Sequence, residues 1–115
     1  MERDVIRHGD ILFRPRERSL DGLTLRPGTI VRRGEVTGHA HRITEGEARI
    51  LEEYETAWTR EGKAQRLKGE YLDVLQTATI THEEHKPLTI GPGLWEIIQA
   101  REFDYVGATI RRVTD

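Results

Sequence analysis

The chain has 115 residues, enough for one domain with a modest hydrophobic core. Its 18 basic and 20 acidic residues nearly balance, which argues against a protein that holds nucleic acid by bulk charge. Because cysteine is absent, disulfides and thiolate metal sites are excluded, and any metal must be held by imidazole and carboxylate. We expect a cytoplasmic protein, since we find no signal peptide and no run long enough to span a membrane.

Short runs of β-forming residues, broken by glycine and proline, predict a mainly β fold without long helices. We therefore expect a single β domain over residues 1–115, built as a small barrel or sandwich. In chain order, the expected strands cover residues 10–13, 23–25, 29–43 (one strand or two, bent at Gly34 and Gly38), 48–54, 70–80, 88–90 and 94–99. The tail after Tyr105 reads as a strand or as one helical turn.

Residues 59–69 form a charged stretch with two glycines between the two arms of an expected hairpin. We expect an exposed excursion that extends the hairpin tip, with a short helix over residues 59–67 as the competing interpretation. Trp58 stands beside this stretch and either packs on its own hairpin or contacts a partner.

The most conspicuous chemical feature is a pair of histidine motifs, Gly38-His39-Ala40-His41 and Thr81-His82-Glu83-Glu84-His85. Alternate residues of a strand share a face, so His39 and His41 point the same way, and Glu35 has the same parity. In an extended strand, His82 continues the inward row of Leu72, Val74, Ala78 and Ile80. We therefore predict that His39, His41 and His82 hold a metal ion, with Glu35 or Glu84 as a carboxylate ligand.

His85 fits this strand poorly, because strict alternation sends it to the opposite face; it joins the site only if the chain kinks before Lys86-Pro87. The ligand types suit zinc, iron, manganese, cobalt or nickel. The two motifs leave open a structural role for the histidines, or a metal-free pair acting as general acid and base. His8, ahead of the first strand, receives no specific role.

The His-x-His segment followed by a later histidine is similar to the cupins, small barrels that hold a divalent metal. That resemblance would add Glu45 as the glutamate ligand and His82 or His85 as the last histidine, although here Pro92-Gly93 follows these histidines instead of preceding them. The words Gly34-Glu35-Val36-Thr37-Gly38-His39-Ala40-His41 and Thr81-His82-Glu83-Glu84-His85, with Arg101-Glu102-Phe103-Asp104-Tyr105, also resemble a family of small uncharacterised bacterial and phage proteins. That family implies no activity.

The favoured function is that of a small metal-binding β-barrel protein. If the protein is an enzyme, we expect a metal-dependent hydrolase acting on a phosphoester or similar small or nucleotide substrate, with His82, Glu84 and His85 as catalytic residues. Glu84 or Glu83 would be the general base, and Arg14 or Arg42 would clamp charge. Two alternatives remain: a self-assembling or binding protein with structural histidines, and a metal-free nuclease. The small size favours a homo-oligomer.

Overall fold

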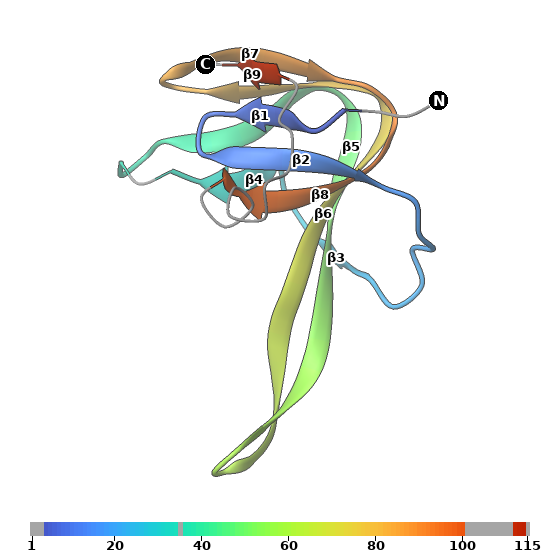
Figure 1. Cartoon of the computed structure of the whole chain (residues 1–115). Coiled ribbons are helices and arrows are strands. Elements are labelled where there is room, and N and C mark those ends of the chain that lie inside the picture. Colours follow the sequence, from blue (N-terminus) through green and yellow to red (C-terminus); the bar gives the residue numbers. More distant parts are fainter. Residues whose placement is uncertain (1–3, 35, 101–111, 115) are drawn as a thin grey trace.

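The computed structural model describes residues 4–34, 36–100 and 112–114, and this part of the chain is mainly β (Figure 1). The described strands, in chain order, are β1 (Ile6–His8), β2 (Ile11–Arg16), β3 (Thr24–Arg26), β4 (Ile30–Arg33), β5 (Ala40–Thr59), β6 (Gly62–His82), β7 (His85–Ile90), β8 (Gly93–Gln99) and β9 (Arg112–Thr114). The predicted fold class is therefore confirmed. A search of the described residues for a helix able to cross a membrane finds none.

All the described strands belong to one sheet, and the long hairpin of β5 and β6 pairs with strands on both of its sides. At the end of the hairpin where β5 begins and β6 ends, β4 pairs with β5 and β7 pairs with β6. Closer to the hairpin turn, β3 pairs with β5 and β8 pairs with β6. Strands β2, β1 and β9 continue beyond β8, with β9 parallel to β1. Among the described strands the path ends at β3 and β9, so the sheet wraps on itself without closing into a barrel.

A bend in the hairpin separates its two parts and lets them enclose a core. Several register shifts occur between Ile43 and Ala48, as β-bulges allow. Gly46 lies there with φ at 86°, and a Cβ on it would lie 2.6 Å from the Cα of Ala78. Only glycine fits this close backbone approach, which explains a glycine inside a long strand.

The main core lies between the two parts of the bent sheet. Strands β2, β4, β5, β6, β7 and β8 contribute apolar side chains to it, mostly in alternation, as expected for a sheet with one buried face. The largest cluster contains Ile11, Phe13, Val31, Ile50, Leu72, Val74, Ala78, Ile80, Leu88, Ile90, Trp95 and Ile97. Trp95 is buried and donates its indole N–H to the carbonyl oxygen of Gly91, 3.0 Å away.

The observed strands refine the expected ones. Residues 29–43 form two strands, joined by a turn that contains Gly34 and Gly38. The first expected strand, over residues 10–13, extends further as β2, and Pro15 lies inside it, paired with Trp95 of β8. The registered pairs between β1 and β2 run only from Ile11 to Phe13, so this proline lies beyond them.

The distal part of the β5–β6 hairpin, residues 54–69, projects away from the rest of the molecule, and we call it the arm (Figure 1). Both strands continue to its end, where Thr59 pairs with Gly62 and only Arg60 and Glu61 remain as a turn. The helical interpretation of residues 59–67 is therefore wrong. Cross-strand pairing, with β-branched and aromatic residues near the tip, outweighs the helix-forming residues of this stretch.

Candidate functional site

Three hairpin turns meet at one end of the fold, and each carries histidines. The β1–β2 turn follows His8, the β4–β5 turn leads into His39 and His41, and the β6–β7 turn joins His82 to His85. The ring centroids of His41 and His82 lie 4.5 Å apart, and those of His82 and His85 lie 4.6 Å apart. Every histidine in the chain therefore belongs to one cluster, which we call the histidine cluster.

The cluster includes His85, contrary to the simple alternation argument. The chain does not run straight through this segment: Glu83 and Glu84 form a two-residue turn, and His85 begins β7 directly opposite His82. Directly opposite residues of an antiparallel pair project to the same face. His85 therefore meets the condition set for it, because the turn interrupts the strand before Lys86-Pro87 and restarts the alternation.

His8 is the member of the cluster that the sequence did not identify. It is fully buried, and its Nδ1 atom lies 3.0 Å from Nδ1 of His41, which is also fully buried. A histidine in a three-residue strand has no local sequence signal for such a contact. The only hint is its position immediately before Gly9-Asp10, a turn-forming pair.

Hydrogen bonds fix the orientation of the buried pair. Nε2 of His8 lies 2.8 Å from the carbonyl oxygen of Lys86, which can only accept a hydrogen bond, so Nε2 carries the proton. Nε2 of His41 lies 3.0 Å from Oδ1 of Asp10, whose other oxygen accepts a hydrogen bond from the side-chain amide of Gln99. Both rings therefore turn Nδ1 toward each other.

Burial, the largest cause, lowers the pKa of His41 to about 4, and the nearby His8 and His82 add to this effect against the hydrogen bond with Asp10. Burial would raise the pKa of Asp10, but the hydrogen bonds from His41 and Gln99 lower it overall. Near pH 7 the Asp10 carboxylate is therefore ionised and His41 is neutral. The carboxylate accepts the hydrogen bond that Nε2 of His41 donates.

The outer part of the cluster is tied to Glu84. Nδ1 of His39 lies 2.9 Å from the carboxylate of Glu84, and this contact lowers the pKa of Glu84. The backbone N–H of Glu84 donates to Nδ1 of His82 over 3.0 Å, so a neutral His82 carries its proton on Nε2. Burial, followed by the neighbouring His85, lowers the pKa of His82. His82 is thus a neutral ring beside an exposed carboxylate.

Glu83 fastens the β6–β7 turn to β5. It accepts a hydrogen bond from the backbone N–H of Ala40 over 2.9 Å and pairs with Arg42 over 2.7 Å. The hydrogen bond from Ala40, the first cause, lowers the pKa of Glu83 to about 2. This carboxylate and Arg42 already neutralise each other at the surface, beside the histidine cluster.

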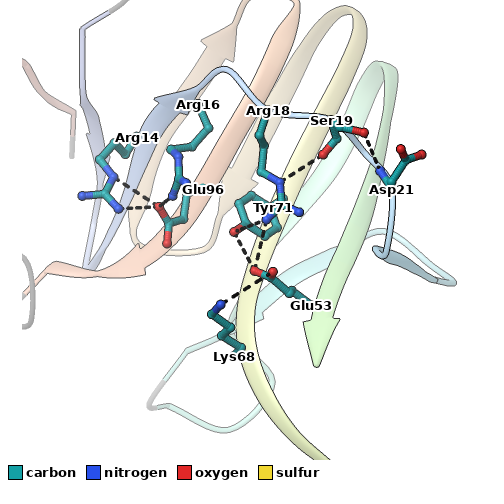
Figure 2. A network of polar contacts seen from close by, with 9 residues as sticks. All are labelled: Arg14, Arg16, Arg18, Ser19, Asp21, Glu53, Lys68, Tyr71 and Glu96. Carbon is teal, nitrogen blue, oxygen red and sulfur yellow. Dashed lines mark hydrogen bonds and ion pairs between the residues drawn. The ribbon is translucent and has the colours of Figure 1, made fainter. Parts of the chain in front are cut away.

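The basic row Arg14, Arg16 and Arg18 points to one side, as its alternation predicts, and meets acidic and phenolic groups (Figure 2). Arg14 and Arg16 both contact Oε1 of Glu96, at 2.5 and 2.6 Å. Arg18 donates to the Tyr71 hydroxyl over 3.2 Å. Because carboxylates offset the charge of these arginines, Arg14, which we expected as a charge clamp, lies in an ion-paired surface.

The predicted metal ligands lie close together, but their nitrogens are not aimed at one point. Nδ1 of His41 faces His8, and Nδ1 of His39 faces Glu84. Glu45 is exposed at the bend, paired with Thr79, and Glu35 lies outside the described residues. Within the described residues, no three histidine or acidic side chains form a ready ligand set.

A pocket of about 280 Å³ opens beside the cluster. It is lined by Asp10, Gly34, Val36, His82, Glu84 and His85. Gly34 keeps it open, because a Cβ there would lie 3.0 Å from Nε2 of His82. The pocket is large enough for a small polar group and presents mainly imidazoles and carboxylates to it.

One family model matches the chain. It is described as Domain of unknown function (DUF8820), and it matches residues 7–100, a span that contains the whole histidine cluster. No curated protein and no solved structure matches. The expectation of an uncharacterised family is confirmed in this general form. Because the model covers most of the sequence, the chain belongs to the DUF8820 family, a domain of unknown function.

Proposed function

We propose that this protein binds one divalent transition-metal ion in the histidine cluster, with Nδ1 of His8 and Nδ1 of His41 as its first two ligands. The observation that carries the proposal is the 3.0 Å contact between these two buried atoms. Metal-binding histidines usually donate their other ring N–H to a carbonyl or carboxylate, which fixes the tautomer. His8 and His41 have such partners in Lys86 and Asp10.

A count of protons supports a cation at this contact. Two neutral imidazoles carry two protons, and the hydrogen bonds to Lys86 and Asp10 use both. The two Nδ1 lone pairs then face each other inside the protein, where their repulsion is weakly screened. A positive charge between the two atoms, either a third proton or a metal ion, relieves this repulsion.

The distance is also suitable for a metal. An ion bonded to two nitrogens at about 2.1 Å, with angles from about 90° to 109°, separates them by about 3.0–3.4 Å. The rings of His82 and His85 are the nearest further ligands, with His82 centred 4.5 Å from His41 and His85 centred 5.8 Å from His8. One of these rings would have to rotate to supply a third nitrogen. All-imidazole donors suit zinc, iron, manganese, cobalt or nickel.

The proposed metal ligands differ from His39, His41 and His82, the set that strand alternation predicts. His41 is common to both, and His82 stays as an additional ligand, whereas His8 takes the place of His39. The Glu84 carboxylate orients His39 and has a lowered pKa, which makes it a weak general base at neutral pH.

The reaction we propose is hydrolysis of a phosphoester or a similar bond in a small substrate. The polar pocket beside the metal ligands favours this class, because a metal ion supplies both an activated water and an electrophile for an anionic group. A second candidate, metal-free acid–base catalysis, is favoured by the same chain of contacts: Asp10 orients His41, and His41 faces His8.

Elemental analysis of the purified protein, followed by titration of the apoprotein with Zn²⁺, Fe²⁺, Mn²⁺ and Ni²⁺, tests the proposal. We expect about one ion per chain, lost in His8→Ala and in His41→Ala and retained in His39→Ala. Circular dichroism of each variant separates loss of ligands from loss of fold. An apoprotein that binds none of these ions contradicts the proposal. If hydrolysis then survives a strong chelator, the metal-free pair is the correct reading.

A further inference from the structure

We propose that this chain self-associates, with the tip of the arm of one copy bound to the bend of the β5–β6 hairpin in a second copy. The tip patch consists of Trp58, Arg60 and Lys63. The bend patch consists of Glu45, Glu47 and Leu75. This inference is independent of the metal site.

The arm is a two-stranded ribbon whose outer strand edges and apolar side chains could be covered by a partner. Pairing of β3 with β5 ends at Glu52, and pairing of β8 with β6 begins at Glu70, so no other described strand pairs with the outer edges of the arm. None of its residues belongs to the buried core clusters of the described chain. Isolated two-stranded ribbons are marginally stable, and open strand edges readily associate.

One face of the arm exposes a row of large apolar side chains. Tyr54 pairs directly with Leu67, and Trp58, four residues along β5, lies on the same face. Their exposed fractions are 45%, 44% and 76%. At the tip, Nζ of Lys63 lies 5.5 Å from the centre of the Trp58 ring. An aromatic side chain this exposed is typical of a contact residue at an interface.

The bend offers a complementary surface on the same molecule. Leu75 is 49% exposed, and Glu45 and Glu47 are exposed on the neighbouring strand. Within the described part of the chain, neither carboxylate forms an ion pair, and neither do Arg60 and Lys63 at the tip. The bend thus combines an exposed apolar group with unpaired acids on the neighbouring strand, and the tip combines an exposed apolar group with unpaired bases.

The charge distribution supports a second copy as the occupant. The arm carries four basic and two acidic residues, and the remaining chain carries fourteen basic and eighteen acidic ones. The arm of one copy is therefore attracted to the rest of another. A nucleic acid fits less well, since Glu53, Glu55 and Glu61 lie along the arm and its base and would repel phosphates.

Exchange of charges between the two patches is a sharp test. One variant carries Arg60→Glu and Lys63→Glu, and the other carries Glu45→Lys and Glu47→Lys. Sedimentation velocity over about a hundredfold range of concentration gives the association constant of each protein. We expect the unaltered chain to associate and each variant alone to associate at least about tenfold more weakly. An equimolar mixture of the two should recover the association, because the reversed tip of one matches the reversed bend of the other.

Trp58→Ala removes the apolar part of the contact, and Leu25→Ala, which alters a 56% exposed leucine on β3, is its matched control. Only the first should weaken association. Both side chains are exposed, so both variants should keep the fold, which circular dichroism verifies. A monomeric unaltered chain would overturn the proposal, and so would variants that associate as well as the parent or a mixture that fails to recover. A monomer that binds a single-stranded oligonucleotide through Trp58 would assign the arm to nucleic acid instead.

Discussion

The backbone of Gly9 lies directly against the imidazole ring of His85: a Cβ at Gly9 would lie 2.7 Å from Cδ2 of that ring and even closer to Nε2. Gly9 also has φ at 62°, a conformation that favours glycine. The β1–β2 turn and the start of β7 can therefore approach each other only because this position has no side chain.

Gly9→Ala should displace His85 and destabilise the protein by at least about 2 kcal/mol, since it combines backbone strain with a steric conflict. Gly22→Ala is the matched control, because Gly22 has φ at 83° with nothing within 4 Å of its added Cβ. We expect Gly22→Ala to cost only about 1–2 kcal/mol. Chemical denaturation gives both values, and the imidazole NMR signals of His85 should move only in Gly9→Ala. Equal costs and unchanged signals would contradict this assignment.

Asp10→Asn should weaken metal binding by about 10–100-fold, because a neutral amide orients and polarises His41 less strongly than a carboxylate. The fold should persist, since the Asp10 side chain is 42% exposed. Isothermal titration of the apoprotein with Zn²⁺ measures the change, and Asp21→Asn on the exposed loop before β3 is the control. Unchanged affinity in Asp10→Asn would show that His41 is not a ligand.

Stability should fall as the pH decreases from about 6.5 to about 4, through the lowered pKa of His41. In this window the unfolded chain binds a proton at His41 and the folded chain does not, so acid favours unfolding. Above about pH 6.5 this group contributes no pH dependence. Urea unfolding in a chelating buffer should show a slope of up to about 1.4 kcal/mol per pH unit, and this part should disappear in His41→Gln. Parallel curves for the two proteins would exclude a neutral buried His41.

Gly46→Ala should destabilise the protein by about 3 kcal/mol or more, since its Cβ would meet the backbone of Thr77 and Ala78 across the bend. Gly62→Ala, at the tip of the arm with φ at 122° and no atom within 4 Å of the added Cβ, is the control for backbone strain alone. Thermal unfolding compares them. A similar loss in both variants would mean that the bend tolerates a side chain.

The strand pattern was largely predictable, because alternation and turn residues are local properties. Strands β5, β6, β7 and β8 contain the expected ranges 48–54, 70–80, 88–90 and 94–99, and each extends beyond them. The turn at Glu83-Glu84 was missed, since two glutamates carry none of the usual turn signals. The helical interpretation of residues 59–67 failed because cross-strand pairing outweighs the helix propensity of residues such as Gln65 and Arg66.

By itself, the sequence determined a thiol-free β domain with its histidines concentrated near strand ends. Only the tertiary structure decided that His8 joins His41, that His85 faces the same way as His82, and which ring nitrogens are already occupied. Alternation relates side chains within one strand, whereas contacts between strands depend on where turns occur and which strands become neighbours. Those choices minimise the free energy of the whole chain, and no short segment encodes them alone.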